Sequence, residues 1–228
     1  MYRKILSASA LAAVVAAPIA HANIVVPGQT VIPDAFGALS GTLLASLHNQ
    51  PFTSSLPNDY TGTFTAWAVS VATPNAVCPA GGCIDFVYQA TNAASSAHVI
   101  ATISASNFAG FATDAGFATS FSTQGPTLTS AAGDIVPSDA FRGISGAPVN
   151  FNFVTPNILA PGDTTDVLVI ETNATNFIAG NLSFINDGTS TNPAFQPALA
   201  VVPEPASLGL LGAALAGLGI LRRRRKAA

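Results

Sequence analysis

Positive charge is almost absent from the middle of this 228-residue chain. Seven of its eight Lys and Arg residues lie near the two ends, so residues 23–202 contain only one of them, Arg142. The same residues contain ten of the eleven Asp and Glu side chains, which gives them a net charge of −9. Because binding to nucleic acid requires clustered Lys and Arg opposite the phosphates, this composition argues against a nucleic-acid partner.

Residues suited to catalysis are also scarce between the ends. The histidines there are His48 and His98, and the sequence has no G-x-S-x-G motif that would mark a nucleophilic serine. Glu171 is the one glutamate of residues 23–202, and no second carboxylate stands at a spacing that indicates a glycoside-hydrolase pair. We therefore expect a protein that is not an enzyme and has no cofactor, with a hydrolase built around His98 as an alternative.

The N-terminus has the parts of a secretion signal. Two basic residues are followed by an apolar run over residues 5–17 and then by the small-x-small sequence Ala20-His21-Ala22. This order predicts a signal helix over residues 1–22, which signal peptidase removes by cutting between Ala22 and Asn23. An uncleaved anchor is the alternative, but the apolar run is short for a membrane span.

The C-terminus predicts a single transmembrane helix. The apolar residues 206–221 would form a helix about 24 Å long, slightly shorter than the bilayer core of roughly 30 Å. Basic residues behind this stretch extend its reach and place this end in the cytoplasm. They are Arg222, Arg223, Arg224, Arg225 and Lys226. Pro203 and Pro205 cannot lie inside the helix and mark its outer boundary, so residues 23–202 lie outside the cytoplasm.

Three features of this end resemble a PEP-CTERM sorting tail when they are taken together: Pro203-Glu204-Pro205, a span rich in Gly, Ala and Leu, and a terminal Arg cluster. The resemblance covers residues 203–228. It implies that Pro203, Glu204 and Pro205 are recognised by an exosortase, a membrane-embedded cysteine transpeptidase. The tail would be processed near the motif, and the protein would reach the cell surface or the exopolysaccharide matrix. A permanent membrane anchor is the alternative.

Residues 23–202, which we call the body, have the composition of a β-protein. They are rich in Thr, Ser, Asn and Phe, have recurrent Gly and Pro, and show no long stripe of period 3.6. We expect one all-β domain, an antiparallel β-sandwich of half-buried strands. Candidate strands are residues 63–72, 84–91, 99–106, 149–154, 166–172 and 182–186. The second alternates most clearly, with Asp85 and Val87 on the face opposite to Phe86.

Three other stretches are less regular. Residues 35–47 fit a helix or a strand, and we expect a strand. Residues 107–121 predict a packed loop with short strand pieces. Residues 192–202, which include Pro193 and Pro197, predict a spacer before the sorting tail.

The two cysteines, Cys78 and Cys83, lie in the sequence CPAGGC between two candidate strands. Outside the cytoplasm they predict a disulfide that closes a hairpin tip, and the short loop would gain about 2 kcal/mol from it. The best calcium ligands are two pairs of aspartates, at positions 134 and 139 and at positions 163 and 166. Aspartate after Gly or Pro forms turns, however, so we expect no metal site.

Two functions for the body follow from these features. The sorting tail, the acidic β-rich body and the lack of a catalytic signature favour a non-enzymatic surface or extracellular-matrix protein, as in a biofilm. The alternative is a polysaccharide-binding module that holds its ligand through Trp67, Tyr60 or Tyr88, although Trp67 also fits a core position in the middle of a strand.

Overall fold

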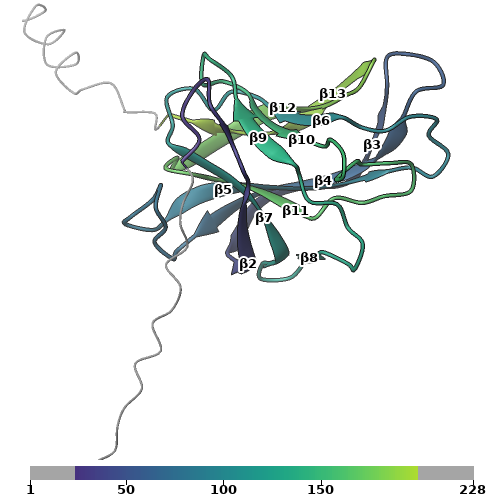
Figure 1. The fold of residues 1–228 in the computed structure, drawn as a ribbon. Helices are drawn as coiled ribbons and strands as arrows, with labels where there is room; N and C mark the ends of the chain where they lie inside the picture. Colours follow the sequence, from purple (N-terminus) through teal and green to yellow (C-terminus); the bar gives the residue numbers. More distant parts are fainter. Residues whose placement is uncertain (1–23, 200–228) are drawn as a thin grey trace, which may run out of the picture.

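The computed structural model describes residues 24–199, which form two β-sheets packed face to face (Figure 1). The predicted all-β sandwich is therefore confirmed for this part of the chain. No helix in residues 24–199 is long and apolar enough to cross a bilayer. The predicted signal helix and the predicted transmembrane helix both lie outside the described residues.

One sheet has six strands and the other has seven. In spatial order the first contains β1 (Thr30–Val31), β9 (Asp139–Arg142), β10 (Val149–Asn152), β6 (Thr102–Ala105), β12 (Asn176–Ile185) and β13 (Thr189–Ala198). The second contains β2 (Asp34–Ser40), β7 (Thr113–Ser122), β11 (Val167–Thr172), β5 (Cys83–Asn92), β4 (Thr61–Val71) and β3 (Thr42–Thr53), and β8 (Thr127–Thr129) pairs with β7. Neighbouring strands are antiparallel except for β2, which runs parallel to β7. The expectation of a purely antiparallel fold is wrong at this edge.

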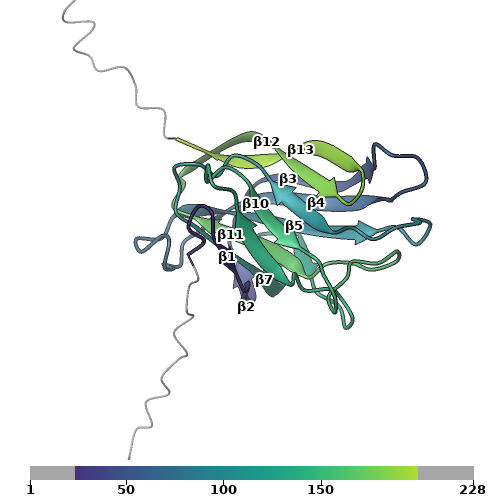
Figure 2. The same cartoon turned by 45° about the horizontal axis from the view of Figure 1, so that its top comes forward.

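Aromatic side chains from both sheets meet in the main core. Phe52 of β3 stacks on Phe184 of β12 with ring centroids 3.8 Å apart, and Phe64 of β4 lies 5.4 Å from the same ring. Because alternate residues of a strand point to the same face, these rings and the buried residues two positions away form the apolar inner face of each sheet. Figure 2 shows the two layers from a second angle. Burial of these facing surfaces is what holds the layers together.

A second apolar cluster covers the outer face of the seven-stranded sheet. Trp67 is the largest side chain of this cluster and is fully buried. Partly buried side chains of β2, β3 and β8 pack against this cluster, among them Phe36 of β2. Phe36 can lie across β7 because Gly116 has no side chain, and a Cβ there would be 2.5 Å from the Phe36 ring. The middle strands are thus buried on both faces, whereas the sequence predicted half-buried strands.

The six candidate strands are confirmed, with shifted ends. Residues 35–47 form parts of two strands, β2 and β3, which are separated at Gly41. The expectation of a loop over residues 107–121 is wrong from Thr113 onward, because β7 begins there. The expected spacer over residues 192–202 is wrong up to Ala198, because β13 contains Pro193 and Pro197. This strand is at the edge of its sheet, where prolines are tolerated.

Candidate functional site

The residues expected to act in sorting lie outside the described part of the chain. They are the cleavage pair Ala22 and Asn23, the motif Pro203, Glu204 and Pro205, and the cluster from Arg222 to Lys226. Their roles stay predictions from the sequence. The described body begins at Ile24, next to the expected cleavage point, and its last strand ends at Ala198, just before the motif.

The three aromatic residues expected to bind sugar are buried. Trp67 belongs to the outer cluster, where His48 contacts it edge-on with ring centroids 5.9 Å apart. The hydroxyl of Tyr60 donates a hydrogen bond to the carbonyl of Phe184, and that of Tyr88 donates one to the carbonyl of Phe195. The two tyrosines connect the layers of the sandwich, Trp67 packs on the outer face of one sheet, and none of the three rings offers an open face on which a sugar could stack.

His98 is exposed, but it is not part of a catalytic triad within residues 24–199. Its backbone N–H donates to the carbonyl of Asp59 at 3.2 Å, and its carbonyl accepts from Asn92 at 3.1 Å. Its imidazole has no hydrogen bond to a serine or an aspartate of the described chain. A hydrolase would require His98, a serine and an aspartate within hydrogen-bond reach of one another, and residues 24–199 do not show this arrangement.

The expected aspartate turns are present. Asp134 accepts a hydrogen bond from the backbone N–H of Ala131 at 2.7 Å, and Asp163 accepts one from Ala160 at 3.0 Å. These contacts are those of turn-forming aspartates. Between Ile24 and Leu199, no group of three or more His, Cys, Asp or Glu residues is arranged to hold a metal ion.

An unexpected feature is a row of three carboxylates on neighbouring strands of the seven-stranded sheet. Glu171 of β11 lies directly opposite Asp114 of β7. On the other side of β11, the pairing of Ile170 with Phe86 places Asp85 of β5 beside Glu171. We call Asp85, Glu171 and Asp114 the carboxylate row. Side chains at facing positions of adjacent strands lie on the same face of a sheet and are close neighbours.

The carboxylate row is almost completely removed from solvent. The exposed fraction is 1% for Asp85, 0% for Asp114 and 7% for Glu171. All four carboxylate oxygens of Asp85 and Asp114 are buried without a hydrogen bond of good geometry among the described residues, although the backbone of Thr172 and of Ala115 lies near enough to offset part of the rise in their pKa values. A buried carboxylate without partners strongly favours its neutral form, so this row must take up protons or find a cation.

Burial and mutual repulsion raise the pKa of each group in the carboxylate row. Burial, followed by the negative charge of Asp34, raises the pKa of Asp114 to about 6. Burial, followed by the charge of Asp114, raises the pKa of Glu171 to about 7, and the nearby amide of Asn75 partly offsets this. The pKa of Asp85 is raised well above its usual value by burial and then by Glu171. Asp114 and Glu171 can therefore change charge between acidic and neutral pH.

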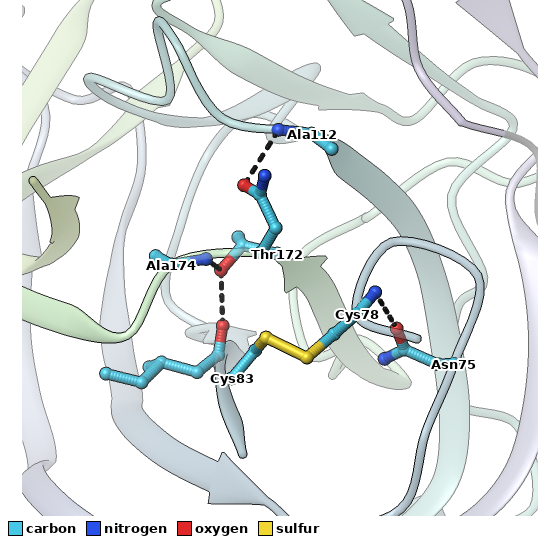
Figure 3. The surroundings of a disulfide bond; sticks show 8 residues. Asn75, Cys78, Cys83, Ala112, Thr172 and Ala174 are labelled. Carbon is cyan, nitrogen blue, oxygen red and sulfur yellow. Dashed lines mark hydrogen bonds between the residues drawn. A yellow bond between two sulfur atoms is a disulfide. The ribbon is translucent and has the colours of Figure 1, made fainter. Parts of the chain in front are cut away.

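The loop beside the carboxylate row is closed by the predicted disulfide. Cys78 and Cys83 are bonded, with their Cα atoms 6.1 Å apart. The side chain of Asn75 accepts a hydrogen bond from the backbone N–H of Cys78 at 2.7 Å, and Thr172 donates to the carbonyl of Ile84 (Figure 3). The disulfide thus positions Asn75, whose amide influences Glu171.

A solvent-open hollow of about 500 Å³ lies at the opposite end of the same sheet. It is lined by residues 53–61, in and around the β3–β4 loop, and by residues 95–97. Gly62 pairs with Asn92 near this hollow, whereas Val69 pairs with Asp85 at the other end of the two strands. The hollow and the carboxylate row are therefore separate features.

Sequence reasoning did not find the carboxylate row. Its members come from three segments far apart in the chain, and only the register of β5, β11 and β7 brings them together. The one available signal was Asp85, which shares a strand face with the apolar Val87.

Comparison with known proteins identifies one segment of the chain. Residues 201–226 match the family model of the PEP-CTERM protein-sorting motif. No curated protein and no solved structure matches the chain. The motif shows that the protein is exported, processed at the membrane and delivered to the surface. The chain carries a PEP-CTERM sorting domain and is a substrate of an exosortase.

Proposed function

We propose that the body is a non-enzymatic component of the cell surface or the extracellular matrix, and that the tail serves only for delivery. The observation that supports this most directly is the burial of the three aromatic side chains that could have bound a sugar. Trp67, Tyr60 and Tyr88 are buried in the described body, where they stabilise the fold. A stable acidic sandwich attached to a sorting motif is suited to a structural role outside the cell.

The route begins with an inner-membrane precursor. Signal peptidase cuts after Ala22, and the apolar residues 206–221 hold the protein in the membrane until the exosortase acts at Pro203-Glu204-Pro205. The body is then released to the cell surface or the matrix, in contact with exopolysaccharide. The short connection between Ala198 and Pro203 keeps the folded sandwich close to the processing site.

Fractionation of producing cells tests the structural role. We expect the processed protein to remain with the exopolysaccharide matrix after washing, and matrix cohesion to fall when the chain is deleted. A chain truncated after Ala198 should pass into the medium. Recovery of the complete processed protein in the medium, with an unchanged matrix in the deletion strain, would contradict the proposal.

Polysaccharide binding is the second candidate, and one observation favours it. The hollow at the β3–β4 loop is lined by hydroxyl and amide side chains, among them Ser55, Asn58 and Ser95. Such groups can hydrogen-bond to sugars without ring stacking. Glycan-array binding by the mature protein, lost in Ser95→Trp and kept in the remote surface variant Gln124→Trp, would support this function. No binding to any matrix glycan would argue against it.

A further inference from the structure

The described chain begins and ends at the same end of the sandwich (Figure 1, Figure 2). The backbone N–H of Val25 donates to the carbonyl of Thr113, the first residue of β7, at 2.8 Å. Ala198 of β13 pairs with Asn176, the first residue of β12. The connecting segments at this end of the sandwich are residues 24–29, 72–82, 106–112, 143–148 and 173–175.

Hydrogen bonds join these segments into one surface. The guanidinium of Arg142 donates to carbonyls in three of them, at residues 25, 108, 111 and 146. The side chain of Asn107 donates to that of Gln196 in β13 at 3.0 Å, and the backbone N–H of Asn173 donates to the carbonyl of Ala112. The segments from both sheets therefore lie side by side.

This surface has no charged residue in any of its connecting segments. None of the five contains Asp, Glu, Lys, Arg or His, and we call them, together with Leu199, the uncharged end. Arg142, Asp114 and Glu171 lie in the strands beneath it and are buried. The connecting segments at the opposite end of the sandwich, by contrast, contain acidic residues, namely Asp59, Asp134, Asp163 and Asp187.

The uncharged end exposes large aliphatic side chains. The exposed fraction is 87% for Ile144, 74% for Leu199 and 54% for Val26. Val26 and Ile144 come from neighbouring segments, because a Cβ at Gly28 would be 3.8 Å from the Ile144 side chain. Single exposed aliphatic residues are common on proteins, but several of them on a surface without charge are typical of a binding site.

The sequence after Leu199 indicates what this surface meets. The match to the sorting motif begins at residue 201, two residues after Leu199, and the protein is processed at the membrane. The interfacial region of a bilayer accepts aliphatic side chains. Its anionic headgroups repel an acidic surface, but they do not repel an uncharged one. The bilayer therefore fits the uncharged end and does not fit the acidic end.

We propose that the uncharged end is a docking surface for the lipid bilayer: while the tail is intact, the side chains of Val26, Ile144 and Leu199 lie among the headgroups and the acidic end points away from the membrane. The proposal goes beyond the structural role and rests on the proposed route, in which the tail holds the precursor in the membrane. Contacts of so few side chains are weak without a second anchor. Removal of the tail therefore also detaches this surface.

Quenching by brominated lipid tests this contact. The chain 23–228 is assembled into nanodiscs of phosphatidylcholine and phosphatidylglycerol, with or without bromine near the headgroup end of the acyl chains. Discs that carry the chain are isolated before the measurement. Trp67 is the only native tryptophan and is fully buried, so the unsubstituted chain gives the background emission. In Ile144→Trp, we expect brominated discs to quench the emission of the added tryptophan.

Val154→Trp is the matched control. Ile144 lies just before β10 and Val154 just after it, so the two exposed aliphatic residues lie at opposite ends of the sandwich. An introduced tryptophan has the same preference for a membrane interface at both positions, and we expect no quenching at position 154.

Quenching at position 144 alone would support the docking surface. Equal emission of Ile144→Trp in brominated and plain discs, or equal quenching of both variants, would overturn it. Two copies of the chain in each disc without quenching would also overturn it, and would assign the uncharged end to contact with a second copy. Because only loaded discs are measured and they contain no matrix and no exosortase, a failure of the structural role or of sorting would not alter the result.

Discussion

Arg142 and the carboxylate row are both buried, but only Arg142 has hydrogen-bond partners throughout its charged group. The guanidinium of Arg142 is 3% exposed and donates to the carbonyls of Val25, Phe108, Phe111 and Gly146 at 2.7–3.1 Å. The oxygens of Asp85 and Asp114 have no hydrogen bond of good geometry in the described chain. Arg142 therefore stays charged and stabilises the fold through its hydrogen bonds, whereas the carboxylate row can gain or lose protons as its surroundings change.

The largest effect should come from removing the satisfied charge. Arg142→Met would remove the guanidinium donor from four carbonyls, and each buried carbonyl that is left unpaired costs about 1–3 kcal/mol. We expect the free energy of unfolding to fall by at least about 3 kcal/mol, measured by urea denaturation of the mature protein. Arg142→Lys keeps the charge but cannot reach all four carbonyls, so its loss should be smaller. Equal stability of Arg142→Met and the wild-type protein would show that Arg142 does not hold these segments.

The pH dependence of stability should reveal the unsatisfied charges. The pKa values of Asp85, Asp114 and Glu171 are raised in the folded state, so the folded chain binds more protons than the unfolded chain between pH 4 and 7. The stability that Asp114 and Glu171 contribute is complete below about pH 4 and declines as pH rises through their folded pKa values of about 6 and about 7. We expect the precursor to lose about 2 kcal/mol between pH 4.5 and 7.5, measured by denaturant titration at each pH.

Comparing variants sharpens this result. Asp114→Asn should flatten the profile, because it removes one of the buried carboxylates, whereas Asp187→Asn, an exposed change between β12 and β13, should not. If stability increased from pH 4.5 to 7.5 in the precursor, the carboxylate row could not be the protonated cluster described above.

Opening the disulfide should have an effect no larger than the pH-dependent loss. The double variant Cys78→Ser with Cys83→Ser should lose about 2 kcal/mol in thermal or urea unfolding, because the closed loop is short. Asn75 would no longer be held beside Glu171, so the pKa of Glu171 should also change, as measured by NMR titration of its carboxyl carbon. A loss of stability without any change in this pKa would separate the loop from the carboxylate row.

The strands could be predicted from the sequence, but their pairing partners in the sheets could not. β4, β5 and β11 were predictable because their apolar residues alternate or form continuous runs, as in the VLVIET sequence of β11. The carboxylate row was not predictable, because strand register depends on the whole fold. The burial of Arg142 was equally hidden, since an isolated arginine in a sequence is expected at the surface.

Proline misled the prediction at the end of the body. Pro193 and Pro197 suggested a spacer, yet both lie in β13 and pair with Asn181 and Phe177 of β12. The missing N–H groups are tolerated because β13 is an edge strand, and the same prolines hinder addition of a further strand. A local pattern cannot distinguish an edge strand from a linker, because the difference depends on the position of the strand in the sheet.

Intact-mass analysis of the protein from producing cells, with and without the exosortase, tests the central claim of export and sorting most directly. With the enzyme, we predict a chain that starts at Asn23 and has lost the Arg cluster from Arg222 to Arg225. Without it, the same start should be found with the tail retained to Ala228. Identical masses in both strains, with the tail intact, would contradict sorting and leave a protein with a permanent anchor.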